Sequence, residues 1–280
     1  MTLTLTTPPT TTLPTTRGRR LGIGNTLRSE WIKMRSVRST TWTLVAMSLI
    51  SVGIAVIAGV ADSNQWSHMS LAEQLTFDPT KKSLQGLLFS QLIIGVLGVL
   101  VVSAEYGTGT IRATLAATPN RPRVLATKAA VFAAVALVVG QLLAFGAFFV
   151  GQALMSPAPH ASLGQPGVLG AVIGAGLMIP VLGLFALGIG AIVRHTAGAI
   201  TTFVAAMFVL PLIVGALPSS VANPIMKFLP IKIGDTMTSV QHVNTGSAFP
   251  PWVGFALLCG YALIALVVGG ILMVRRDAGT

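Results

Sequence analysis

Charged side chains are scarce in this sequence. Only 9% of the 280 residues are Asp, Glu, Lys or Arg, whereas 53% are hydrophobic. A soluble domain of this length needs far more charge to cover its surface, but lipid tails solvate aliphatic side chains directly. The composition therefore excludes an ordinary water-soluble globular protein and predicts an integral membrane protein.

Cysteine is scarcer still, because Cys259 is the only one and it lies inside the last apolar run. A single cysteine excludes an intrachain disulfide and a cysteine-rich metal site. The four histidines are scattered at no metal-ligand spacing, and no HExxH, Ser-His-Asp or paired-carboxylate pattern lies within an apolar run. We therefore expect this chain to hold no metal and to carry no catalytic residues.

What the sequence does contain is long apolar runs without Asp, Glu, Lys or Arg. Six of them are long enough to cross a bilayer. They cover about residues 42–61, 84–104, 129–155, 168–193, 197–217 and 252–274. None shows the polar–apolar alternation of a transmembrane β-strand. We predict an all-α integral membrane fold of six transmembrane helices in one domain, residues 25–280, with kinks at Pro180 and Pro211 in the fourth and fifth spans.

The basic residues indicate which way the helices cross. If both termini are cytoplasmic, 14 of the 18 Lys and Arg residues fall in cytoplasmic segments, and the outer segments keep only Lys81, Lys82, Lys227 and Lys232. This positive-inside bias predicts a multi-pass protein of the plasma membrane with both termini in the cytoplasm. Insertion alone accounts for the net charge of +11, so we expect no nucleic-acid partner.

The segment before the first span divides into two parts. Residues 1–20 contain nine Thr and three Pro without a signal-peptide core, so we predict a disordered cytoplasmic tail over 1–24. The sequence NTLRSEWIKMRSVRSTTW follows, with Asn25 as a possible helix cap and apolar residues at helical spacing. Two interpretations stay open, an amphipathic helix in the headgroup region or a basic flank. The residues of the predicted interface helix are Leu27, Glu30, Trp31, Lys33, Met34 and Arg35.

A polar segment separates the second and third spans. Gly107 and Gly109 permit a tight reversal after Glu105, and Thr110 can cap a short helix that ends at Thr118, before Pro119. A turn over 118–121 then leads into a helix from Pro122 to about Met155. That helix has 34 residues, or about 50 Å, against a hydrocarbon thickness of about 30 Å. We predict that its surplus length projects into the cytoplasm and holds the short helix away from the membrane.

These residues resemble a known family. Glu105-x-x-x-Gly109-Thr110-Ile111-Arg112 with the following Ala-Thr-Pro resembles the coupling-helix loop of permeases of ABC exporters in the type-2 superfamily. Residues 29–40, SEWIKMRSVRST, are similar to the interface helix before the first span of those permeases. Phe228-Leu229-Pro230 with Gly234 resembles their outer re-entrant element between spans five and six. The three matches occur in the family's order and cover the chain after residue 24.

The resemblance implies a permease subunit that forms half of an export pathway and receives motion from a separate nucleotide-binding ATPase, which would hold ATP and Mg²⁺. This chain has no G-x-x-x-x-G-K-[ST] phosphate loop of its own. The family's pattern makes Glu105 an acidic anchor, paired with Arg112 or with the ATPase. The implied coupling interface comprises Glu105, Gly109, Thr110, Ile111, Arg112, Thr114, Leu115 and Arg121. A second permease chain, a copy or a relative, would complete the pathway.

Two other functions remain as alternatives. An ion-coupled secondary transporter normally carries an ionisable residue near the bilayer midplane, and the six predicted spans contain none. A membrane anchor or assembly protein would use the same loops only to recruit partners. The sequence does not select a transported substrate, because an uncharged apolar lining suits lipids, hydrophobic drugs, peptides or polymers equally.

Overall fold

The computed structural model describes residues 22–118, 120–240 and 248–276, and over these ranges it is helical and contains no strand. The predicted tail over 1–24 falls almost wholly outside the described residues, as does Pro119 in the predicted turn. The long helices are α2 (Arg38–Gln65), α5 (Leu87–Gly107), α7 (Arg121–Leu154), α8 (Val168–Val193) and α13 (Pro251–Arg275). The shorter ones are α1 (Ile23–Ser36), α3 (Leu71–Leu75), α4 (Pro79–Leu84), α6 (Thr110–Ala117), α9 (Thr196–Val204), α10 (Leu210–Gly215), α11 (Ser219–Met226) and α12 (Pro230–Thr238).

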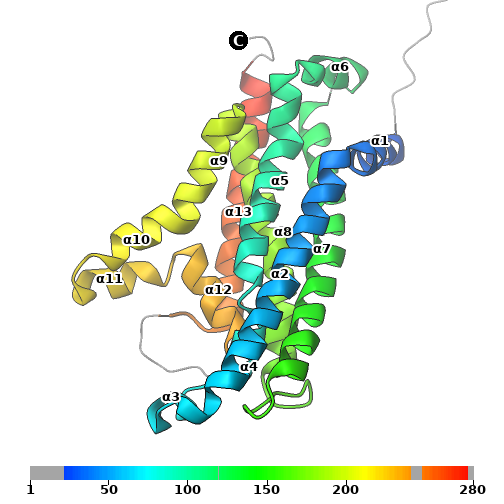
Figure 1. Ribbon diagram of the computed structural model, residues 1–280. Helices are drawn as coiled ribbons and strands as arrows, with labels where there is room; N and C mark the ends of the chain where they lie inside the picture. The colour runs from blue at the N-terminus through cyan, green and yellow to red at the C-terminus, as the bar shows by residue number, and fades with distance from the viewer. Residues whose placement is uncertain (1–21, 119, 241–247, 277–280) are drawn as a thin grey trace, which may run out of the picture.

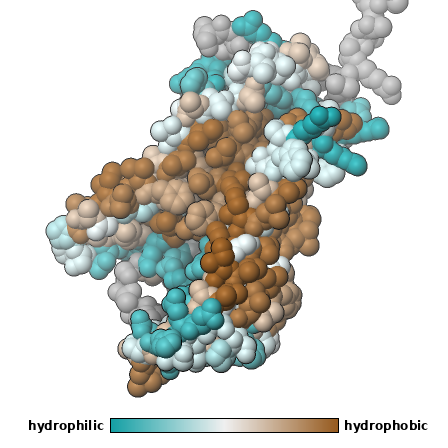
Figure 2. All heavy atoms as spheres, viewed as in Figure 1, coloured by the Kyte–Doolittle hydropathy of each residue, from teal (hydrophilic) through white to brown (hydrophobic). Residues whose placement is uncertain are grey.

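Six helical segments within the described ranges are long and apolar enough to span a membrane, which confirms the predicted helical class. They cover Arg38–His68, Pro79–Gly107, Arg121–Leu154, Val168–Val193, Thr196–Gly215 and Pro251–Arg275. The face of the molecule in Figure 2 carries a broad hydrophobic band with hydrophilic residues gathered toward both ends. Such a distribution is that of a multi-pass membrane protein.

Several spans are longer than the apolar runs predicted. The first begins at Arg38 rather than 42, and the second begins at Pro79 rather than 84. Helices extend past apolar runs because polar side chains at their ends are satisfied locally. At the start of the second span, for example, the Asp78 carboxylate accepts a hydrogen bond from the Lys81 amide at 3.0 Å.

The two prolines have different effects. Helix α8 runs unbroken through Pro180, so the predicted kink does not end the helix there. Before Pro211, a π-helical turn over Ala205–Val209 separates α9 from α10. A π-turn is one way a helix accommodates a local break in its hydrogen-bond ladder.

Helix α8 is the most enclosed of the six spans, because 72% of its 18-residue apolar stretch is buried inside the protein. Helices α5, α7 and α13 pack around it. Small residues allow this close packing. A Cβ built on Gly98 of α5 would lie 2.3 Å from the carbonyl oxygen of Gly183 on α8. The two backbones are therefore in direct contact, as is common between membrane helices that meet at glycine.

The bundle has two distinct ends (Figure 1). Helices α1 and α6 lie at one end together with the last turn of α13, and we call this the α6 end. Helices α3 and α4 lie at the other, the α3 end. Between the fifth and sixth spans, α10 leads away from the bundle, and α11 and α12 return to it, where α12 packs against α13 and α8. Phe228-Leu229-Pro230 forms the junction of α11 and α12.

Candidate functional site

Four charged side chains meet at the α6 end of the bundle. Lys128 Nζ of α7 lies 2.6 Å from Glu105 Oε1 of α5 and 2.8 Å from Glu30 Oε2 of α1. Lys33 Nζ of α1 lies 3.0 Å from the same Glu105 oxygen and 3.1 Å from Glu30 Oε1. Two carboxylates and two ammonium groups therefore form a charge-balanced network, which we call the α6-end charge cluster.

The cluster is largely shielded from water. Lys128 is only 2% exposed, and Glu30 is also buried, whereas Lys33 lies at the edge with its side chain 44% exposed. Removing one partner of a buried ion pair typically costs about 3–5 kcal/mol, because it leaves an uncompensated charge. Since its members come from α1, α5 and α7, the cluster fixes three helices relative to one another.

The connection from α5 to α7 runs over the cluster. Gly109 adopts the left-handed conformation, with φ of 72°, and this reversal starts α6 at Thr110. Gly109 is therefore the cap residue, and the predicted capping role of Thr110 is wrong. Helix α6 ends at Ala117 with Thr118 as its C-cap, which confirms the predicted stop before Pro119. The Asn120 side chain then accepts a hydrogen bond from the Arg123 amide, and α7 starts one residue before Pro122.

Helix α1 packs on the bundle through a polar face. It begins at Ile23, so Asn25 lies inside the helix and does not cap it. Thr26 and Glu30 are buried, whereas Trp31 is 49% exposed. The predicted apolar side of this helix is therefore divided, because Met34 packs against the main hydrophobic core and Leu27 is half-buried, while Trp31 faces outward. Pairing of Glu30 with Lys128 makes burial of the polar residues beside them favourable, because an unpaired buried charge would be costly.

Helix α6 divides the predicted coupling residues between two faces. Ile111 is 1% exposed and belongs to the main hydrophobic core, against which Leu115 also packs. Thr114 Oγ1 accepts a hydrogen bond from Lys33 Nζ at 3.4 Å. The exposed residues of this segment are Gly109, Thr110, Arg112, Ala113, Ala116 and Ala117. These exposed residues form a second face of α6, on the side away from the buried Ile111.

The predicted partner of Glu105 requires correction. Its carboxylate pairs with Lys33 and Lys128 rather than with Arg112, which lies on the exposed face of α6. Lys128 is one of the 14 basic residues predicted to be cytoplasmic, and its pairing with Glu105 was not predicted. A signal was available, because Lys128 directly precedes a long apolar run, where a charge needs a buried partner. Glu105 Oε2 is buried and receives no hydrogen bond from the described residues.

Two arginines attach the end of α13 to its neighbours. Arg121 Nη1 donates to the carbonyl oxygens of Met273 at 3.0 Å and Arg276 at 3.2 Å. Arg194 Nη2 donates to the Leu272 carbonyl at 2.7 Å, and its guanidinium lies 5.0 Å from the Tyr106 ring centroid. The bonds from Arg121 engage carbonyl groups at the end of α13, and the bond from Arg194 adds to the Leu272 carbonyl, which already accepts the Arg276 amide. Arg121, predicted at the coupling interface, therefore holds α7 to α13.

The pKa of Lys33 reflects the cluster. Burial by itself lowers the pKa of this ammonium, but the hydrogen bond and charge of Glu105, with those of Glu30, outweigh burial and raise it above the ordinary value of 10.5. Lys33 therefore stays charged throughout the physiological range.

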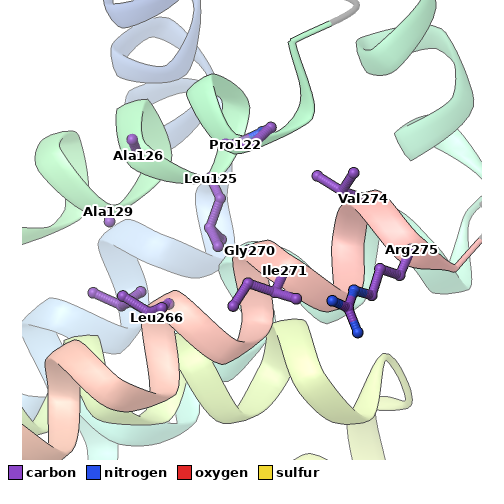
Figure 3. Close-up of a pocket in the computed structure, with 10 residues that line it drawn as sticks. Pro122, Leu125, Ala126, Ala129, Leu266, Gly270, Ile271, Val274 and Arg275 are labelled. Carbon is purple, nitrogen blue, oxygen red and sulfur yellow. The ribbon is translucent and has the colours of Figure 1, made fainter.

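An apolar groove of about 490 Å³ lies between α7 and α13, close to the α6 end. Leu125 of α7 points toward Gly270 of α13, and Arg275 stands among the lining residues (Figure 3). The other lining residues are Pro122, Ala126, Ala129, Leu266, Val267, Ile271 and Val274. Apart from Arg275, the residues that line the groove are apolar.

A comparison with known protein families and with curated proteins finds no match to this chain. Within the described ranges, no three His, Cys, Asp or Glu side chains gather closely enough to hold a metal ion. The candidate site therefore consists of the α6-end charge cluster and the exposed face of α6.

Proposed function

We propose that this chain is the permease subunit of an ATP-driven exporter of the type-2 ABC superfamily. In this proposal α6 is the coupling helix, and the α6 end, with both chain termini, faces the cytoplasm. The exposed face of α6, including Thr110 and Arg112, docks on a separate ATPase subunit that binds ATP and Mg²⁺. A second permease chain, identical or related, completes the pathway in the plasma membrane.

The observation that carries the proposal is the α6-end charge cluster beneath α6. Only Thr108 and Gly109 separate α5 from α6, and residues 118–120 separate α6 from α7. A displacement of α6 therefore acts directly on two spans. Because Glu105, Lys33 and Lys128 bind α1, α5 and α7 together, those helices would move as one body. The α11–α12 segment would serve as the outer re-entrant element.

The test is crosslinking within native membranes, in a Cys259→Ser background without other thiols. Ala113→Cys on the exposed face of α6 should crosslink to an ATP-hydrolysing subunit that copurifies in stoichiometric amount. Leu71→Cys, exposed on α3 at the opposite end, is the matched control and should not. If both thiols react with a soluble label but neither captures an ATPase, the proposal fails and a secondary transporter or a membrane anchor is favoured.

A further inference from the structure

A second cavity, of about 370 Å³, lies between the start of the second span and α12, toward the α3 end. Its lining comes from α4, α5, α11 and α12 and combines an apolar wall with the polar residues Lys81, Gln85, Gln91, Lys232, Asp235 and Thr238. The apolar residues are Leu84, Leu87, Leu88, Met226 and Ile231. The volume falls in the range of small-molecule sites, about 300–1,000 Å³. Since no lining residue is aromatic, the walls suit a flexible acyl chain better than a planar ring.

A buried amide lines this aliphatic cavity. Gln91 is 3% exposed, and its Oε1 atom is buried without a hydrogen bond from the described residues. Gly234 of α12 faces it, and a Cβ there would lie 3.5 Å from Gln91 Nε2. Rotation about χ3 exchanges the amide oxygen and nitrogen, so Gln91 can present either atom to the cavity. With its oxygen turned toward the cavity, Gln91 can accept a hydrogen bond from a ligand N–H or O–H.

Three charged groups stand among the lining residues. Asp235 forms ion pairs with Lys81 and, at 3.4 Å, with Lys232. Burial raises the pKa of Asp235, but these two lysines outweigh it and hold the pKa below its ordinary value of 3.8. Two ammonium groups facing one carboxylate leave an excess of one positive charge. This charge favours an anionic group on whatever enters the cavity.

We propose that this cavity is a binding site for an anionic acyl amphiphile with an amide or hydroxyl hydrogen next to its head group. The acyl chain lies against the leucine wall, the N–H or O–H group meets Gln91, and a carboxylate or phosphate meets Lys81 and Lys232. The site rests on the residues of α4, α5, α11 and α12 that line the cavity and does not depend on the proposed coupling to an ATPase.

The test uses the full chain in nanodiscs of phosphatidylcholine, with N-dodecanoylglycine as the probe and its N-methyl analogue, which lacks only the N–H, as the comparison. Calorimetry should give saturable 1:1 binding of the probe, roughly 3- to 10-fold tighter than that of the N-methyl analogue. Gln91→Leu should equalise the two affinities. Equal affinities in the unaltered protein would overturn the role of Gln91 and with it the proposal.

Two further comparisons test the charge and the location. Neutral N-dodecanoylethanolamine should bind more weakly than N-dodecanoylglycine, but only a few-fold, because Lys232 is partly exposed and its charge is screened by solvent. Lys232→Gln should remove that difference in affinity. Leu88→Trp, which fills the cavity, should abolish saturable binding. Leu142→Trp on the exposed side of α7 is the matched control and should leave binding unchanged. Binding that survives Leu88→Trp would place the ligand elsewhere and refute the proposal.

Discussion

Lys128 on α7 and Glu105 on α5 form an ion pair of 2.6 Å in which the lysine is almost completely buried. The same ammonium also holds Glu30 of α1, so one side chain bridges two acidic residues that lie 75 positions apart in the sequence. An arrangement of the three helices that left one of these buried charges unpaired would be costly, so the network favours the arrangement in which all four groups are paired.

Removing Lys128 should destabilise the protein severely. Lys128→Met leaves Glu30 and Glu105 with Lys33 as their remaining partner in the cluster, so we expect a loss of about 3–5 kcal/mol in unfolding free energy. Unfolding in mixed micelles with increasing denaturing detergent measures it. The double variant Lys128→Met/Glu105→Gln restores charge balance and should recover part of the loss, with a coupling energy of about 0.5–3 kcal/mol. Strict additivity of the two changes would contradict the cluster.

Neutralising Glu105 should separate ATP hydrolysis from export. In Glu105→Gln the amide keeps the shape of the side chain but weakens its hold on Lys33 and Lys128, so motion of α6 reaches α1 and α7 less directly. In proteoliposomes with the partner ATPase, we expect transport per ATP to fall by roughly 10-fold, about 1.4 kcal/mol of coupling. Glu73→Gln, an equivalent change on an exposed helix cap at the α3 end, is the control. Unchanged transport in Glu105→Gln would remove Glu105 from the mechanism.

Apolar run length predicted the helical class and the six spans because lipid imposes a simple rule. A segment must be apolar and helical over about 20 residues to cross the bilayer. Gly109 and Thr118 likewise bounded α6 correctly, since a positive φ and a residue before proline are local constraints. Both kinds of feature depend on few neighbours, so sequence pattern carries them.

The charge cluster was not predicted, because it depends on which helices meet. Glu30 and Lys128 are 98 residues apart, and each alone is typical of an ordinary juxtamembrane charge. The apolar spacing of Leu27, Trp31 and Met34 predicted one face of α1, and Met34 does pack against the core, but the fully buried residues of the helix are Thr26 and Glu30. The spacing of apolar residues within one helix does not indicate which residue of another helix will pair with a buried polar group and make its burial favourable.

The contribution of Lys33 to stability should persist until strongly alkaline pH. Its pKa in the folded protein is raised above 10.5, so the stabilisation is fully present below that value and is lost only as pH rises through the higher folded pKa. The difference in thermal stability between the unaltered protein and Lys33→Met should be constant between roughly pH 6 and 9 and shrink above 10.5. The difference should be small, because a half-exposed pair is screened by solvent. A decline already below pH 9 would be inconsistent with the raised pKa.

Close packing of α5 on α8 should make Gly98 intolerant of any side chain. A Cβ at that position would lie 2.3 Å from the Gly183 carbonyl oxygen, which belongs to the backbone and cannot rotate away. Gly98→Ala should therefore push the two helices apart and destabilise the protein by about 1–3 kcal/mol, measured by unfolding in mixed micelles. Gly146→Ala on α7 is the matched control, because a Cβ there has no neighbouring atom within 4 Å, and it should be neutral or stabilise by about 0.5–1 kcal/mol. Equal effects of the two substitutions would show that the backbones of α5 and α8 are not in contact at this point.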